Sequence, residues 1–215
     1  LYEAGSGAGT IQPNINSNSA TGACANIGGG KDNIASGLHS VVAGGCGNKA
    51  IARHSSVLGG TGNCACATGS VVLGGESNTT QDCGQYNYSV ILGGRLNRAC
   101  GCNATVIGGR QSCACGNNTS TVSGYRNRAS GSVANVAGGT GNCAIGTVTT
   151  VGGGISNFSC GNYSAIAGGC GNRITSGANN GFMGAGQRNR VCANSGVPVS
   201  GYCNCAIGAC GFVGT

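Results

Sequence analysis

The sequence predicts an all-β fold: a parallel β-roll, or β-solenoid, built from fifteen-residue repeats. Three observations support this prediction. A glycine recurs every fifteen residues, an asparagine follows it three positions later, and small and β-branched residues occupy fixed places between them. A short fixed period is typical of a solenoid, in which each repeat, here called a rung, buries its apolar face only against its neighbours. Such a chain is expected to be a rod with a mechanical or adhesive function.

The recurring glycine marks a corner of each rung, where it takes a positive φ without the clash of a Cβ atom. The interval is fifteen residues except for nineteen before Gly94 and seventeen before Gly186. The 46 glycines follow no Gly-X-Y period, which excludes collagen. The series is Gly30, Gly45, Gly60, Gly75, Gly94, Gly109, Gly124, Gly139, Gly154, Gly169, Gly186 and Gly201.

An asparagine is the fifth residue of each rung, counted from the first turn glycine, with Ser112 as the single exception. Because stacked strands lie about 4.8 Å apart, these amides should form a ladder. The expected role is structural, since Asn tolerates a left-handed backbone and bonds its neighbours. The ladder comprises Asn18, Asn33, Asn48, Asn63, Asn78, Asn97, Asn127, Asn142, Asn157, Asn172, Asn189 and Asn204.

Two further columns predict two short strands per rung that meet across a thin core. Position seven is mostly alanine and position fourteen is mostly Val or Ile, which suit pleated, buried strands. A glycine at each corner excludes a continuous coiled coil. Typical members are Ala35, Ala50, Ala65, Ala99, Ala129 and Ala144 at position seven, and Ile27, Val42, Val57, Val72, Ile91, Val106, Val136, Val151, Ile166 and Val199 at position fourteen.

The second strand of the rung is apolar on both faces, because positions thirteen and fifteen are also often apolar, as in Val71 and Leu73. A strand of this kind is usually buried on both faces. The first strand carries Lys49 or Arg98 at position six, which belong in water. One wet side and one apolar side predict oligomerisation along the length of the roll.

The residues divide into an N-terminal lead-in or capping segment, residues 1–13, and a repetitive roll of about 13 rungs, residues 14–214. The ends, which lack an initiator methionine and stop where another glycine turn is due, suggest a piece of a longer protein. The net charge of +7 is dispersed, and only nine aromatic residues are present. These features predict no nucleic-acid partner, and the absence of a long apolar run predicts no membrane insertion.

The pattern resembles the YadA-like head repeat of trimeric autotransporter adhesins and related repeats of bacteriophage tail fibres. The matching motifs are the Ser-Val-x-x-Gly-Gly turns, such as Ser40 to Gly45 and Ser89 to Gly94, and the Asn-x-Ala-x-Gly segments, such as Asn33 to Gly37. The similarity covers roughly residues 14 to 214. It implies a left-handed parallel β-roll that assembles side by side as a homotrimer, and it implies a role in surface attachment.

Two departures from the adhesin pattern favour a phage fibre. The Gly-Gly-x-x-Asn unit is about one residue longer than the usual adhesin unit, and sixteen cysteines are present, whereas exported autotransporters generally avoid cysteine. Three roles for cysteine stay open: small packing residues, a rung-to-rung disulfide such as Cys100 with Cys115, or a thiolate metal site. Cysteines two apart, such as Cys64 and Cys66, are expected to be too extended to bridge each other.

Two sets of residues are candidate sites. His39 and His54, fifteen residues apart, should stack on neighbouring rungs and are weak candidates for a metal site between chains. Insertions in repeats often form binding loops. The extra residues near 79–88 and 173–181 are therefore candidates, and Asp82, Gln85, Tyr86 and Tyr88 suit carbohydrate contact. The alternatives are solvated corner histidines and a tolerated surface bulge.

No catalytic set or cofactor is predicted, because the four acidic residues are scattered and neither histidine has an evident nucleophile partner. The prediction is a structural or adhesive segment of a phage tail fibre, located on a virion or cell surface. Its expected partners are its own copies, other fibre or virion proteins, and a glycan or protein receptor. The alternatives are a bacterial adhesin head or extracellular filament subunit, and an ice-binding solenoid, for which the regular Thr array is missing.

Overall fold

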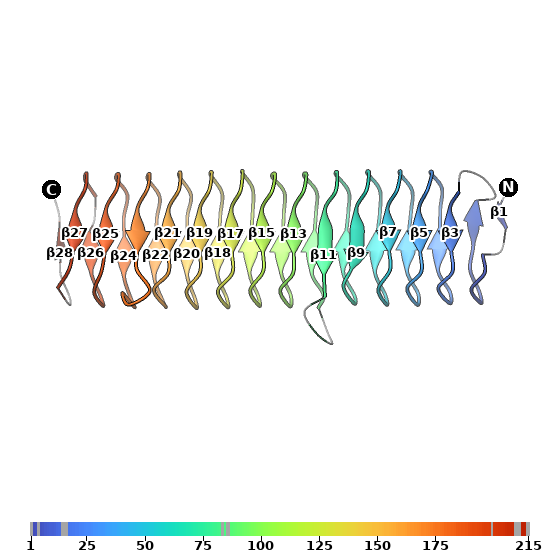
Figure 1. Cartoon of the computed structure of the whole chain (residues 1–215), viewed down its shortest axis with the longest axis horizontal. Coiled ribbons are helices and arrows are strands. Elements are labelled where there is room, and N and C mark those ends of the chain that lie inside the picture. The colour runs from blue at the N-terminus through green and yellow to red at the C-terminus, as the bar shows by residue number, and fades with distance from the viewer. Residues whose placement is uncertain are drawn as a thin grey trace. The chain divides into compact units, whose positions relative to one another are not determined.

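The computed structural model describes residues 2–3, 5–13, 17–82, 84, 87–198, 200–208 and 212–213. All elements in these ranges are β-strands; the ranges contain no helix, and so none that could cross a membrane. The chain divides into two units, Leu1–Arg110 and Gln111–Thr215. In each unit every second strand along the chain stacks in parallel, apart from the antiparallel pair β1 and β2, as Figure 1 shows, which confirms the predicted all-β solenoid.

Unit 1 alternates between two parallel sheets, here called the even sheet and the odd sheet after their strand numbers. Each strand pairs with the strand two places along the chain, so that Val41 pairs with Ser56 and Lys49 with Cys64. The even strands are β4 (Asn26–Ile27), β6 (Val41–Val42), β8 (Ser56–Val57), β10 (Val71–Val72), β12 (Val90–Ile91) and β14 (Thr105–Val106). The odd strands are β3 (Ser19–Ala20), β5 (Ile34–Ala35), β7 (Lys49–Ala50), β9 (Cys64–Cys66), β11 (Thr79–Gln81) and β13 (Arg98–Ala99).

The first residues of unit 1 differ, because β1 (Tyr2–Glu3) and β2 (Gln12–Pro13) pair antiparallel. The parallel stacking nevertheless begins before residue 14. Ser6 donates its N–H to the Ala20 carbonyl, and Ile11 forms a parallel bridge with Asn26. Part of the predicted capping segment therefore already stacks as the repeats do.

Unit 2 is built in the same way. Its even strands are β16 (Ser120–Thr121), β18 (Asn135–Val136), β20 (Thr150–Val151), β22 (Ala165–Ile166) and β24 (Phe182–Met183). Its odd strands are β15 (Cys113–Ala114), β17 (Arg128–Ala129), β19 (Cys143–Ala144), β21 (Phe158–Ser159), β23 (Arg173–Ile174), β25 (Arg190–Val191) and β27 (Cys205–Ala206). A separate parallel pair is formed by β26 (Val197–Pro198) and β28 (Phe212–Val213).

The core of each unit consists of the two predicted columns. One side chain of each stacked strand faces the core. Ala35, Ala50 and Ala65 on odd strands meet Val42 and Val57 on even strands, and all five are fully buried. The column predicted from position fourteen is buried throughout the described residues, whereas Val199 lies outside them. Burying a Val or Ile side chain contributes about 1.5–3 kcal/mol, and here the gain repeats at every rung.

Two irregular rungs interrupt the period without breaking the sheets. In unit 1, Ile91 pairs with Val72 and Ala99 with Thr80, so the extra residues leave the stack between β11 and β12. In unit 2, Met183 pairs with Ile166, and the extra residues lie between β23 and β24. In Figure 1 the chain leaves the stack of strands at the end of β11. The first residues of both expected ranges, Thr79–Gln81 and Arg173–Ile174, belong to paired strands, and the extra residues follow them.

Candidate functional site

The asparagine column forms the predicted ladder, and each amide is saturated by its neighbours. Asn33 donates from Nδ2 to the carbonyl oxygens of Gly29 and Gly45, both at 3.0 Å, and its Oδ1 accepts the backbone N–H of Asn48 at 2.9 Å. Its own N–H donates to Oδ1 of Asn18 at 3.0 Å. The Asn33 side chain thus joins its own corner to the following rung, and the Asn18 side chain joins the preceding rung to Asn33 in the same way. The same pattern recurs at Asn48, Asn63, Asn78, Asn142, Asn157 and Asn172, and in part at Asn97 and Asn127.

The corner glycine beside each asparagine is required by close backbone approach. Gly30 has a φ of +85°, and a Cβ atom there would lie 2.0 Å from the carbonyl oxygen of Gly45. Any side chain would therefore separate the rungs as well as strain the backbone. The ladder and its glycines form one structural unit, and this region is a scaffold rather than a ligand site.

The outer face of the even sheet in unit 1 carries an exposed apolar column, defined here as Leu58, Leu73, Leu92 and Ile107. These residues follow β8, β10, β12 and β14 on successive rungs, and their side chains are 51%, 42%, 43% and 45% exposed. Val71 and Val90 lie two residues before Leu73 and Leu92 and so on the same face, where they are half-buried. A continuous apolar patch of this kind usually marks an interaction surface.

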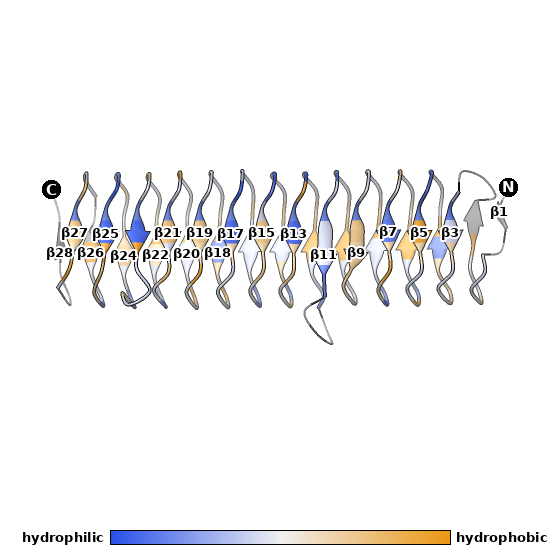
Figure 2. Ribbon diagram, viewed as in Figure 1, coloured by the Kyte–Doolittle hydropathy of each residue, from blue (hydrophilic) through white to orange (hydrophobic). Residues whose placement is uncertain are grey.

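The outer face of the odd sheet is mixed. Lys49 and Arg98 in unit 1 are exposed, as expected for a wet face. In unit 2 the arginines Arg128, Arg173 and Arg190 lie on the same face, where Figure 2 shows hydrophilic segments at β17 and β25. The Arg173 guanidinium lies 5.7 Å from the centre of the Phe158 ring on the preceding rung.

The predicted ligand site at the first insertion is described only in part. Asp82 is exposed, and its carboxylate accepts the N–H of Gly84 at 3.1 Å. Tyr88 is 56% exposed, and its ring lies against Gly69 on the previous rung, where a Cβ would meet ring atoms at 2.6 Å. Gln85 and Tyr86 lie outside the described residues. Carbohydrate contact at this loop stays a prediction.

His39 and His54 stack as their spacing predicted. Their ring centroids are 5.2 Å apart and the planes differ by 5°. Both side chains are exposed at left-handed corners with a φ of 55°, and Arg53 donates from Nε to His54 Nε2 at 3.0 Å. That hydrogen bond occupies one imidazole nitrogen of His54, so a metal would have to use the other nitrogen or displace Arg53. The metal role stays a prediction.

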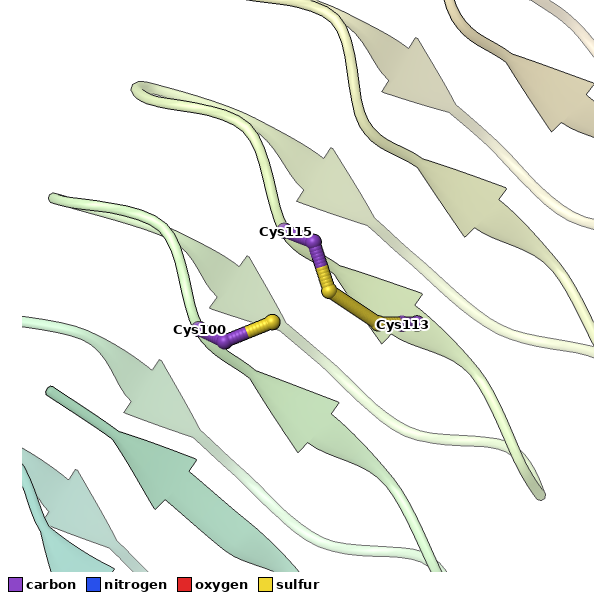
Figure 3. A group of neighbouring side chains, drawn as sticks. All are labelled: Cys100, Cys113 and Cys115. Carbon is purple, nitrogen blue, oxygen red and sulfur yellow. A yellow bond between two sulfur atoms is a disulfide. The ribbon is translucent and has the colours of Figure 1, made fainter. Parts of the chain in front are cut away.

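The prediction that cysteines two apart would not bridge is wrong. Disulfides join Cys64 with Cys66 in β9, and Cys113 with Cys115 across β15 (Figure 3). The Cα atoms are 5.5 and 5.9 Å apart, within the range of about 4.4–6.8 Å that disulfides accept. Residues two apart on a strand point to the same face, so the two sulfur atoms of each pair lie on one side of the sheet. The sulfur atoms of Cys100, Cys113 and Cys115 all lie within 4.8 Å of one another, and the Cys100–Cys115 bond stays a prediction.

A buried thiol lies on the odd sheet of unit 2. Cys143 is only 6% exposed, between its strand neighbours Arg128 and Phe158. Burial raises the pKa of the Cys143 thiol to about 11, against the smaller opposite effect of the Arg128 guanidinium. Such a thiol is a packing residue rather than a nucleophile, in agreement with one of the three roles considered for cysteine.

A second asparagine ladder in unit 2 was not predicted from the sequence. Thr147 donates its N–H to Oδ1 of Asn162, Asn162 donates to Asn179, and Asn179 donates to Asn194, each at 2.9 Å. The signal was present, since asparagine occupies the corner before β22, β24 and β26 on three successive rungs. It was obscured by the two-residue insertion, which shifts the spacing to seventeen.

The sequence matches no protein-family model, and no curated protein is significantly similar to it.

Proposed function

We propose that the chain is a structural and adhesive fibre segment: a left-handed β-roll of fifteen-residue rungs that assembles side by side as a homotrimer. In this proposal it forms a shaft or receptor-binding part of a bacteriophage tail fibre and mediates attachment to a host surface. The role is non-enzymatic, and the partners are copies of the chain, other virion proteins and a surface glycan or protein receptor.

The observation that carries the proposal is the apolar column of unit 1. Four large aliphatic side chains on successive rungs are between 42% and 51% exposed in the single chain. The repeat of the roll sets their spacing, so another copy of the same roll offers an equally spaced row. Burying such rows against one another would stabilise the assembly by about 25 cal/mol for each Å² of apolar surface removed from water.

The ladders support the mechanical part of the proposal. Except at Ser112, the described rungs that carry a ladder asparagine are held to the next rung by backbone bonds and by an amide, as in the bonds of Asn63 to Gly75 and Asn78. Stretching or bending the roll would have to break these bonds on several rungs together. Stacked identical amides are a known source of rigidity in parallel β assemblies.

Attachment follows from repetition rather than from a deep pocket. Exposed corners such as Tyr88 and Tyr163, which are 56% and 63% exposed, recur along the roll. A trimer would present three copies of each, and linked weak contacts raise avidity well above that of a single contact.

A surface location is further supported by the disulfides Cys64–Cys66 and Cys113–Cys115, because disulfides persist mainly in oxidising surroundings. The same observation favours the second candidate, an extracellular adhesin head or filament subunit. The two candidates share the roll and the trimer, and they differ only in the particle or cell that carries them.

The proposal is tested by changing the apolar column and measuring the mass in solution. The double variant Leu58→Ser/Leu73→Ser should shift the trimer towards monomer, with a dissociation constant raised at least tenfold. The matched control is Leu38→Ser/Leu96→Ser, since these leucines are similarly exposed, 36% and 42%, at corners of the same unit. The control should leave the mass unchanged, and equal behaviour of the two variants would reject the column as the interface.

A further inference from the structure

Two thiols on the odd sheet of unit 2 lie within reach of each other without being bonded. Cys192 directly follows β25 and Cys205 begins β27, and their sulfur atoms are 3.9 Å apart. The strands are parallel neighbours, with Arg190 paired to Cys205 and Val191 to Ala206. The two cysteines therefore lie diagonally across adjacent rungs, and both are free in this structure.

Other described cysteines nearby are less well placed. Cys203 lies in the corner before β27, with a φ of 59°, and its N–H donates to the Gln187 carbonyl of the preceding rung. Cys205 lies in the strand itself, and its sulfur is a hydrogen-bond neighbour of Cys192. Cys203 and Cys205 thus differ from Cys64 and Cys66, which both lie within one strand.

We propose that Cys192 and Cys205 form a disulfide between adjacent rungs when the protein meets a low-molecular-weight disulfide such as oxidised glutathione. One cysteine thiolate attacks a glutathione sulfur, forms a mixed disulfide and releases one glutathione thiolate. The second cysteine, after losing its proton to solvent, attacks the protein sulfur of the mixed disulfide and releases the other glutathione. In sum, two protein thiols are oxidised to one disulfide and one oxidised glutathione is reduced to two glutathione molecules.

The surroundings decide which sulfur reacts first and under what conditions. Cys205 is exposed, whereas Cys192 is half-buried, so Cys205 is the first nucleophile. Partial burial and the neighbouring Cys192 raise the pKa of the Cys205 thiol, and the Arg190 guanidinium opposes them. The reaction should therefore be faster above neutral pH, where more of the thiolate is present.

The bond would close a covalent loop around residues 193–204, which include β26. A cross-link here constrains the unfolded chain of the two rungs that it joins and so opposes their opening. The inference is independent of the proposed fibre function.

The experiment uses the full chain, reduced and then exposed to oxidised glutathione at pH 8. The protein is denatured in acid, its remaining thiols are blocked, and it is digested with chymotrypsin, which cuts after Tyr202 and so separates Cys192 from Cys203 and Cys205. Mass spectrometry without reduction should find the two fragments joined. The joined species should disappear in Cys192→Ser and in Cys205→Ser, and it should persist in the control Cys203→Ser.

Two results would overturn the inference. One is a Cys203–Cys205 bond with Cys192 left free, which would show that the corner cysteine is the true partner. The other is stable glutathione on both Cys192 and Cys205 without a bond between them, which would show that the rungs hold the sulfurs apart.

Discussion

The even sheets of the two units have the same interior and different exteriors. In unit 1 the residues that follow β8, β10, β12 and β14 are Leu, Leu, Leu and Ile, the apolar column. In unit 2 the residues that follow β16, β18, β20 and β22 are Val122, Ala137, Gly152 and Ala167. The inward residues match, with Val or Ile fully buried in nearly every even strand of both units.

This difference separates the requirements of the fold from those of assembly. The interior needs a β-branched residue at each rung because two sheets must meet across a thin layer, and both units meet that need. The outer face has no such requirement within one chain. Large apolar residues gathered on the outer face of unit 1 therefore point to a contact that unit 2 does not make in the same way.

The largest expected effect tests whether the interiors are equivalent. Ile91 and Ile166 are both fully buried on even strands, one in each unit. Ile91→Ala and Ile166→Ala should each lower the free energy of unfolding by about 3 kcal/mol, because each leaves a cavity that the neighbouring strands cannot fill. Urea unfolding at one protein concentration measures both. Losses that differ more than twofold would show that the two interiors are not equivalent.

A smaller loss is expected from the ladder. Asn63→Ala and Asn142→Ala each leave two glycine carbonyls and one backbone N–H without their buried partner, at a cost of about 2 kcal/mol. Thermal unfolding followed by circular dichroism should show similar shifts for the two variants. Asn26→Ala, at the half-buried outward position of β4 in unit 1, is the comparison variant and should have little effect. A tolerated ladder substitution would contradict the structural role of the amides.

The smallest effect is a dependence of stability on pH that comes from the odd sheet of unit 2 and begins only above about pH 9. The pKa of the Cys143 thiol rises from 9.0 to about 11 on folding, so the folded state holds its proton more strongly. The stabilisation is complete below pH 9 and is lost as the pH rises towards 11. Comparing the pH dependence of unfolding for the natural chain and Cys143→Ser isolates this group. Parallel curves between pH 9 and 11 would contradict the assignment.

Much of the fold follows from the sequence, because few other residue types could occupy the positions that repeat. Glycine and asparagine recur at the positions of Gly30 and Asn33, because each corner requires a positive φ and a buried amide. Valine or isoleucine recurs at the positions of Val42 and Val57, because each even strand contributes one side chain to the core. The disulfides Cys64–Cys66 and Cys113–Cys115 do not follow from the sequence, because in a fully extended strand residues two apart lie too far from each other to bridge. The second ladder at Asn162, Asn179 and Asn194 was hidden by the insertion, and nothing in one chain's sequence identifies the receptor.

The proposed trimer is tested most directly by the mass of the unmodified chain in solution at low concentration, measured by light scattering with and without reductant. We expect a particle three times the 20.6 kDa of the chain, unchanged by reductant, because apolar side chains rather than disulfides hold it together. A stable monomer would contradict the proposed assembly. A trimer that falls apart on reduction would replace the apolar column with intermolecular disulfides as the cause of association.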